Sequence, residues 1–228
     1  MHTCAGGSLT HLEATMILVG QYDSPYVRRV AVSLHALGLD FERNTMSVFA
    51  DADAMRRINP LGRIPALILD GGETLIDSAA ILDHLDEMVG RSRALLPASG
   101  ADRRRALQII ALATGCIDKV GAIAYEQTLR PAEKVHAPWI DRCRAQLESG
   151  IAALESWTGP GWYLGGDRPM QPDIAAGCMI GYLRLRAPDA FPAGAYPRLE
   201  HLSASCEATP WFRAATAAAD ETMPSAPL

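Results

Sequence analysis

The chain has 228 residues, of which 49% are hydrophobic, and a formal net charge of -5. This apolar fraction is enough for the core of a globular protein with one large domain or two small ones. The acidic balance and the lack of a Lys/Arg block argue against nucleic acid or an anionic membrane as the main partner. The sequence contains no run of about 18 apolar residues, so we predict no membrane span.

The cysteines and histidines do not form a recognisable metal or redox motif. The five cysteines are scattered and contain no CxxC pair: Cys4, Cys116, Cys143, Cys178 and Cys206. Three of them fall on apolar faces of predicted helices, which indicates reduced core residues of a cytoplasmic protein. The six histidines show neither HExxH nor clustered ligand spacing, so we expect no metal site.

The amino-terminal part predicts a strand followed by a helix. Residues 1–15 lack the basic and apolar regions of a secretory signal, so we expect a disordered extension. The apolar run at residues 16–22 predicts a short buried strand. A helix then begins with Ser24 at the N-cap and Pro25 at the first helical position, and Gly38 ends it.

A hydroxyl at the start of a helix is suited to a bound thiolate. Ser24 can donate a hydrogen bond to the sulfur while the helix dipole favours the negative charge. Such a bond is worth about 1.5 to 3 kcal/mol, enough to lower a thiol pKa of about 8.5 by about one to two units. Tyr22 is the alternative hydroxyl, and a plain helix cap is the alternative role for Ser24. We interpret Arg28 and Arg29 as solvated or paired surface charges.

The central stretch, residues 59–86, contains a candidate peptide-binding edge. Residues 41–48 predict a second strand and residues 50–58 a short helix before it. Within it, Ile64-Pro65 lies where a loop enters a strand, and a cis X-Pro bond costs only about 0.5 to 1 kcal/mol over trans. With Pro65 cis, the N–H and C=O of Ile64 can pair with an extended peptide as an added strand would.

The same stretch continues into a hairpin and a helix. Asp70-Gly71-Gly72 predicts the turn between the segments ALIL and ETLI. Asp77-Ser78 then caps a helix, and its N-terminal N–H groups and the Ser hydroxyl suit a carboxylate, whereas Asp77 suits an α-amino group. The order βαβα and then ββα is that of the thioredoxin-like fold.

This stretch resembles the glutathione transferase family, whose first domain carries N-P-x-G-x-[IV]-P-x-L, a glycine-rich hairpin and [ED]-S at a helix start. The segment SPYVRRVAVSLHALGLDFE is similar to bacterial, serine-type members. The resemblance implies that Ile64 pairs with the cysteinyl backbone of glutathione and that Asp77, more often Glu in the family, holds the γ-glutamyl end with Ser78. It implies that Ser24 ionises the thiol. Arg63 is a weaker candidate for the glycyl carboxylate.

The second half of the chain predicts helices only. Residues 90–100 form a linker by composition. On the long helix after it we expect a core stripe of Leu107, Ile110, Ala111, Thr114, Ile117, Gly121 and Ala124. The side facing the first domain, where a second substrate would bind, is assigned to Cys116, Val120 and Tyr125.

The remaining helices complete a predicted bundle. The next core stripe consists of Ile140, Cys143, Leu147, Ile151 and Leu154, and residues 175–185 predict a buried axis. Asp173 lies in a segment similar to the family's capping-box signature L-x-G-x-x-x-[ST]-x-A-D-I, but Met170 stands at the Ser/Thr position, so its capping role stays open. Residues 197–208 and 210–220 predict two further helices.

The chain is identified as a member of the glutathione transferase family on these motifs. We expect an α/β thioredoxin-like domain over 16–89, an all-α helical bundle domain over 101–220 and a loose tail over 221–228. The resemblance implies a cytoplasmic homodimer that conjugates glutathione, as substrate and without a metal, to a small hydrophobic electrophile.

Other outcomes at the same site stay open. One is a glutathione-dependent isomerase, such as a maleylacetoacetate isomerase, or a dehalogenase or disulfide reductase. The family's isomerase pattern begins with S-S-C at this helix, and Asp23-Ser24-Pro25 departs from it. Another is a non-catalytic glutathione-binding scaffold that keeps the fold.

Overall fold

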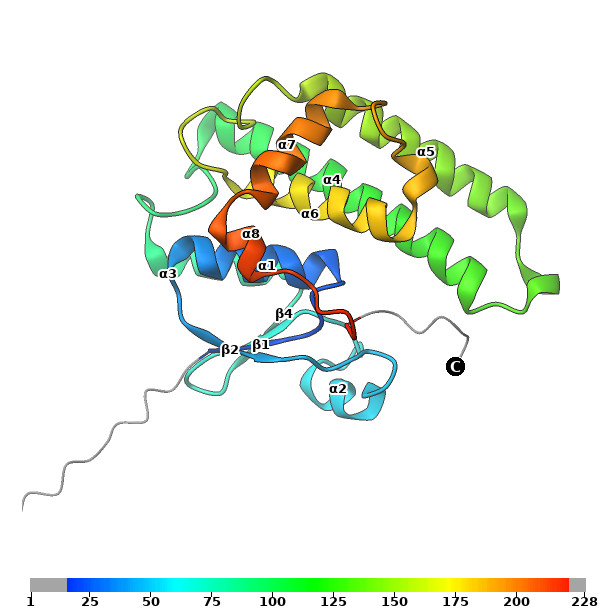
Figure 1. Cartoon of the computed structure of the whole chain (residues 1–228). Helices are drawn as coiled ribbons and strands as arrows, with labels where there is room; N and C mark the ends of the chain where they lie inside the picture. Colours follow the sequence, from blue (N-terminus) through cyan, green and yellow to red (C-terminus); the bar gives the residue numbers. More distant parts are fainter. Residues whose placement is uncertain (1–15, 222–228) are drawn as a thin grey trace, which may run out of the picture.

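A four-stranded mixed sheet organises the first half of the chain. The computed structural model describes residues 16–221 (Figure 1). The expected extension 1–15, with Cys4, lies outside the described residues, as does the expected tail apart from Glu221. The strands are β1 (Met16–Val19), β2 (Phe41–Asn44), β3 (Ala66–Ile68) and β4 (Thr74–Ile76), in the spatial order β2-β1-β3-β4. β1 is parallel to β2, and β3 is antiparallel to both β1 and β4.

Three helices cover this sheet on its two faces. They are α1 (Pro25–Leu37), α2 (Ala52–Ile58) and α3 (Ser78–Val89). α1 and α3 contact each other on one face, whereas Met55 of α2 packs with Val19 and Ala66 on the other. Figure 1 shows α2 on the side of the sheet away from the other helices. The observed order confirms the thioredoxin-like prediction, although β2 ends at Asn44, before the predicted residue 48.

The register of the sheet brings two loops together. Val19, the last residue of β1, lies opposite Ala66, the first residue of β3. The loop that leads from β1 to α1 therefore begins beside the loop that enters β3. Ser24 lies on the first of these loops and Ile64-Pro65 on the second. Residues distant in sequence are thus placed at one edge of the sheet.

The second half of the chain is a helical bundle, as predicted. Its α-helices are α4 (Gly100–Thr128), α5 (Ala137–Trp157), α6 (Gln171–Arg186), α7 (Pro197–Glu207) and α8 (Pro210–Ala214). Two 3-10 turns, η1 (Ala132–Lys134) and η2 (Pro188–Ala190), connect them. α6 is buried at every residue from Gln171 to Ile180 and contacts α1, α4 and α7, which confirms the predicted axis over residues 175–180. In the rest of the predicted axis, Leu183 is buried but Leu185 is exposed. α8 ends before residue 220, because the chain turns across α1, where the Ala215 carbonyl accepts a hydrogen bond from Arg28.

Apart from Ile117, the predicted core stripe of α4 is wrong by about one helical position. The buried face consists of Ala106, Ile109, Ala113, Cys116, Ile117, Val120 and Ile123. Leu107 is exposed, and most of the other predicted residues line the cavities toward the first domain: Ile110, Ala111, Thr114 and Gly121. α4 has two apolar faces because it contacts α5 and α6 on one side and borders cavities on the other. For the same reason its length and hydropathy alone would also suit a membrane span.

Other core predictions agree with the structure. The predicted stripe of α5 is buried throughout. Cys116, Cys143, Cys178 and Cys206 are buried free thiols. Burial raises the pKa of both Cys116 and Cys178 to about 12, which keeps these thiols protonated and unreactive near neutral pH.

Asp173 caps α6, although Met170 stands where the family's capping box usually has Ser or Thr. The fully buried carboxylate accepts hydrogen bonds from the Met170 N–H at 2.9 Å and from the Tyr163 N–H at 2.8 Å. The thioether of Met170 takes the place of the usual hydroxyl toward the Asp173 N–H. Desolvation nevertheless outweighs the hydrogen bonds and raises the pKa of Asp173 to about 6.

Candidate active site

Two adjoining cavities lie between the first domain and α4. The α1 cavity, of about 520 Å³, includes Ser24 at the start of α1. The α3 cavity, of about 470 Å³, includes Asp77 and Ser78 at the start of α3. Four residues line both cavities and mark their boundary: Tyr26, Arg63, Ile64 and Asp118. The two cavities therefore form one groove.

The α3 cavity collects the residues predicted to bind a peptide. Ile64, Pro65, Arg63, Asp77 and Ser78 all line it, and the Ile64-Pro65 bond is cis. Within residues 16–221, the N–H and C=O of Ile64 make no hydrogen bond to another group of the chain. An extended peptide can therefore pair with this backbone as an added strand does.

The start of α3 is shaped by Asp77. This residue has a positive φ of 70°, and its side chain accepts a hydrogen bond from the Ala79 N–H at 2.8 Å. Asp77 is thus the N-cap, while Ser78 is the first helical residue and is buried. The carboxylate of Asp77 stays exposed at the rim of the cavity, where it can meet a cationic group.

Gly20 allows the two loops of the site to approach closely. Its φ is +132°, and a Cβ at this position would lie 2.6 Å from Val27 Cγ2 and 2.9 Å from Ile64 Cβ. A larger residue would push the β1-to-α1 loop away from Ile64. The glycine therefore keeps Ser24 near the edge that Ile64 presents.

Ser24 combines a capping role with access to the groove. Its Oγ accepts a hydrogen bond from the Val27 N–H at a long 3.4 Å, and its side chain lines the α1 cavity. Among the described residues the Ser24 hydroxyl has no acceptor, so its proton can be donated to a ligand. The cap and a catalytic donor are compatible, because capping uses only a lone pair of the oxygen.

Tyr22, the alternative hydroxyl, lies outside the groove. It lines neither cavity and is 2% exposed, beneath the Arg43 guanidinium at 3.4 Å from the ring centroid. Its hydroxyl is buried without a hydrogen-bond partner in the described part of the chain. Burial raises the pKa of Tyr22, which further disfavours a phenolate. The geometry thus brings Ser24 to the groove and leaves Tyr22 behind it.

The interpretation of Arg29 as a surface charge is wrong. Arg29 is only 3% exposed and lines the α3 cavity, because its side of α1 is covered by the second domain. It makes no ion pair with the residues that the structure describes, and burial lowers its pKa. Arg28 is paired, with Glu207 at 2.8 Å. An unpaired buried guanidinium is a ready partner for the carboxylate of a ligand.

Tyr26 and Asp118 were not predicted as site residues. The Tyr26 hydroxyl donates a hydrogen bond to Asp118 of α4 at 2.5 Å, and also contacts the Thr114 carbonyl at 3.2 Å. Burial and the Asp118 carboxylate both raise the pKa of Tyr26, so it remains a neutral donor. The aromatic residue in the Ser-Pro-Tyr segment was the available signal, but its partner on α4 was not visible in the sequence.

The outer part of the α1 cavity is mainly aromatic and apolar. Phe49, which precedes α2, meets Tyr125 of α4 edge to face with ring centroids 6.3 Å apart. Tyr182 of α6 lines the same cavity, and Asp23 at its edge is paired with Arg186 at 3.0 Å. Of the three α4 residues assigned to a second-substrate pocket, only Tyr125 lines it. Cys116 and Val120 belong to the core, which corrects that prediction.

The arrangement can hold an extended peptide with a thiol. A peptide lying in the α3 cavity along Ile64 would direct a central side chain across the shared boundary toward Ser24. An apolar molecule in the α1 cavity would then meet that side chain. Within residues 16–221, no group of three or more His, Cys, Asp or Glu side chains is placed to hold a metal ion.

Comparisons with known proteins match both halves of the chain. The family model described as "Glutathione S-transferase, N-terminal domain" matches residues 18–93, and "Glutathione S-transferase, C-terminal domain" matches residues 137–202. The uncharacterized GST-like protein YibF of Escherichia coli is 33% identical over 172 residues, covering 75% of this chain and 83% of that protein.

Two further proteins cover nearly the whole chain. The maleylacetoacetate isomerase of Pseudomonas aeruginosa is 32% identical over 224 residues, with 92% of this chain and 100% of that protein covered. The crystal structure of a glutathione S-transferase from Methylobacterium radiotolerans, in complex with glutathione sulfonate, superposes with a TM-score of 0.84. It is 32% identical, and the match covers 92% of this chain and 98% of that one.

Proposed function

Because the chain belongs to the glutathione S-transferase family, we propose that it conjugates the glutathione thiolate to a small hydrophobic electrophile. The observation that carries the proposal is the continuous groove. Its α3 cavity contains the peptide-binding residues, its α1 cavity contains Ser24, and the two meet at Ile64.

Glutathione fits the α3 cavity by the chemistry of its groups. The cysteinyl N–H and C=O pair with the unoccupied backbone groups of Ile64. The γ-glutamyl carboxylate meets the N–H groups at the start of α3 and the buried Arg29 charge, and its amino group meets Asp77. Arg63, at the boundary of the cavities, is the candidate for the glycyl carboxylate.

Ser24 then favours the ionised form of the thiol. Its hydroxyl donates to the sulfur at the N-terminus of α1, where the helix dipole also stabilises negative charge. The thiolate attacks the electrophilic carbon, a sulfur–carbon bond forms, and the leaving group departs or the carbon's π bond takes the electron pair. The aromatic cavity positions the electrophile, and positioning supplies much of the rate.

A second candidate function is isomerisation with glutathione returned unchanged. The similarity to the Pseudomonas aeruginosa maleylacetoacetate isomerase over nearly the whole chain favours it. Against it, Arg63 is the only cationic side chain among the residues that line the α1 cavity, so a substrate with several carboxylates finds few partners there. Mass spectrometry of the products separates the two, because conjugation consumes glutathione and isomerisation does not.

We also propose the quaternary state and location usual for the family. The resemblance implies a two-fold dimer, with the first domain of one chain against the helical domain of the other. A cytoplasmic location agrees with the buried, reduced cysteines. Sedimentation at several protein concentrations tests the dimer, and a purely monomeric protein at micromolar concentration would contradict it.

The first test is calorimetric titration with reduced glutathione in two buffers of different ionisation enthalpy. A site that ionises the thiol releases a proton on binding, so the observed enthalpy must change with the buffer. We expect release by the wild type and less release by Ser24→Ala. Binding without release would favour a scaffold, and no binding at millimolar glutathione would exclude the transferase.

A further inference from the structure

Glu221 contacts the loop that carries Ser24. Its carboxylate accepts a hydrogen bond from the Tyr22 N–H at 2.6 Å, across 199 residues of sequence. The same carboxylate forms an ion pair with Arg43 of β2, whose Nη2 lies 2.8 Å from each oxygen. The Arg43 guanidinium in turn covers the Tyr22 ring. The end of the described chain is therefore tied to the backbone two residues before Ser24.

The environment of Glu221 indicates a fixed contact. The residue is 5% exposed, although it lies near the carboxyl terminus. A buried carboxylate is stable only when charged or N–H partners replace its water. Glu221 has both kinds of partner: Arg43 supplies the opposite charge and the Tyr22 N–H a further hydrogen bond. The contact thus restrains the Tyr22 backbone more firmly than an exposed ion pair would.

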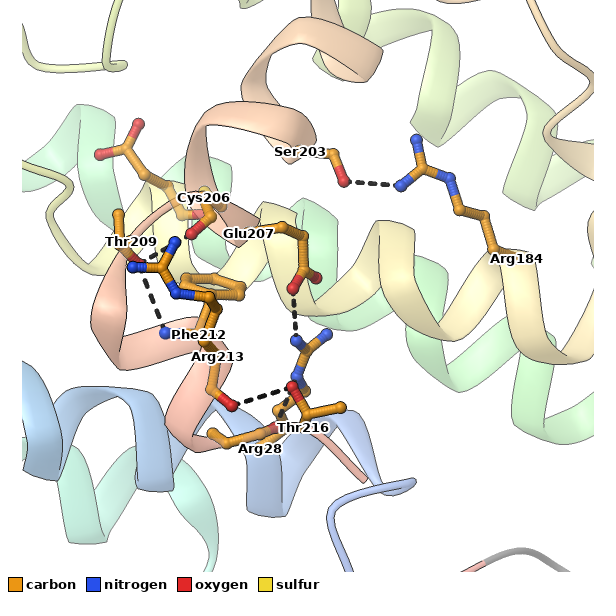
Figure 2. A network of polar contacts seen from close by, with 11 residues as sticks. Arg28, Arg184, Ser203, Cys206, Glu207, Thr209, Phe212, Arg213 and Thr216 are labelled. Atoms are coloured by element: carbon orange, nitrogen blue, oxygen red, sulfur yellow. Dashed lines mark hydrogen bonds and ion pairs between the residues drawn. The ribbon is translucent and has the colours of Figure 1, made fainter. Parts of the chain in front are cut away.

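The helical domain also holds the other residues around Ser24. Arg186 of α6 pairs with Asp23 at 3.0 Å. Figure 2 shows the Arg28 guanidinium reaching Glu207 of α7, and Arg28 Nε donates to the Ala215 carbonyl at 3.0 Å. Ser24 lies between these anchored positions, and among the described residues its side chain hydrogen-bonds only with the Val27 N–H. Its position in the groove is therefore set by its neighbours.

We propose that Glu221 is a positioning residue for Ser24, acting through the Tyr22 N–H. This inference rests on the proposed function, in which Ser24 donates to the glutathione sulfur. Without Glu221, the Tyr22 N–H and Arg43 lose their shared acceptor and the loop gains freedom on the side remote from the groove. A displacement of about 1 Å at a catalytic group can cost two orders of magnitude in rate. Loss of Glu221 therefore weakens thiol activation while the α3 cavity stays intact.

The test is the pKa of the glutathione thiol bound to the full chain, followed by thiolate absorbance against pH. We compare the wild type with Glu221→Ala, Ser24→Ala and the double variant. Glu221→Ala is expected to raise the pKa of the bound thiol by roughly half a unit to one unit, a three- to tenfold loss in its ionisation constant. At a pH where the bound thiol is fully ionised, the affinity for glutathione should change by a smaller factor than the ionisation constant does. Glu133→Ala, on the exposed turn η1, is the matched control.

The double variant distinguishes positioning from a merely structural role. If Glu221 acts through Ser24, its removal has no further effect on the thiol pKa in the Ser24→Ala background. Equal shifts in both backgrounds, or no shift beyond the Glu133→Ala control, would overturn the inference while the proposed function stands. A wild type that leaves the thiol pKa unchanged would overturn both.

Glu221→Gln provides the same test if Glu221→Ala does not fold. The amide has nearly the same shape and keeps one oxygen for the Tyr22 N–H, but it loses the charge that pairs with Arg43. We expect a smaller shift of the thiol pKa in the same direction, again absent when Ser24 is replaced. A Gln variant that folds like the wild type and shifts the thiol pKa equally with or without Ser24 would contradict positioning.

Discussion

The hydroxyl of Tyr26 and the carboxylate of Asp118 join α1 to α4 through a hydrogen bond of 2.5 Å at the boundary of the two cavities. The bond links the thioredoxin-like domain to the helical domain at the place where we expect the thiol. Both residues line both cavities, so the domain contact and the candidate site share the same side chains.

Tyr26→Phe should therefore weaken the contact between the domains. The variant loses a hydrogen bond to a charged group. Because Asp118 is exposed, we expect the free energy of unfolding to fall by about 1 to 2 kcal/mol, less than for a fully buried bond of this kind. Urea denaturation measures it. Tyr196→Phe is the control, because within residues 16–221 the Tyr196 hydroxyl has no hydrogen bond to lose. Equal stability of the two variants would contradict a contribution from the Asp118 contact.

Ser24→Ala should reduce kcat/KM for conjugation by roughly ten- to a hundredfold, because a hydrogen bond to a charged group is worth about 1.5 to 3 kcal/mol. Tyr22→Phe serves as the comparison. Since its hydroxyl is buried and unpaired among the described residues, the variant should keep full activity and equal or higher stability. If Ser24→Ala retains more than a tenth of the wild-type rate at all pH values, activation by this hydroxyl fails.

Arg29→Met separates stability from binding. The buried guanidinium has no ion pair with the described residues, so a similarly sized apolar side chain should leave the unfolding free energy unchanged or raise it. The same change removes a positive charge from the α3 cavity and should weaken glutathione binding roughly tenfold. Chemical denaturation and calorimetry test the two effects. Arg104→Met, on the exposed face of α4, should alter neither.

Asp173 should give the stability an identifiable pH dependence. Its pKa in the folded protein is about 6, above the ordinary 3.8, so the fold favours the protonated acid. The resulting stabilisation of the folded state is on the order of 2 to 3 kcal/mol. It is fully present below about pH 4 and is lost as the pH rises through about 6. The unfolding free energy of the wild type relative to Asp173→Asn should therefore decrease over that range.

The control for this titration is Asp167→Asn, an exposed substitution six residues earlier on the loop before α6. Its unfolding free energy should follow the wild type at every pH. A constant difference between the wild type and Asp173→Asn from about pH 4 to about pH 7 would show that the capping hydrogen bonds offset desolvation completely.

Local signals in the sequence predicted much of the fold and the residues that the structure brings together in the α3 cavity. Ser24-Pro25 and Gly38 mark the ends of α1 through capping chemistry that involves only neighbouring residues. The order of strands and helices follows from short apolar runs and turns, which are also local. The motif around Ile64-Pro65 and Asp77-Ser78 lies within one short stretch, so its members could be recognised together.

The sequence by itself thus determined most of the elements, the family and the residues whose place in the groove follows from their own stretch of backbone. Only the tertiary structure decided which face of α4 is core, that Arg29 is buried, and that Tyr22 lies behind the site. It also decided that Asp118 and Glu221 reach residues of the first domain. Periodicity shows that a helix has an apolar face but not which neighbour covers it, and a long-range hydrogen bond leaves no spacing in the chain. Those contacts exist only once the two domains pack.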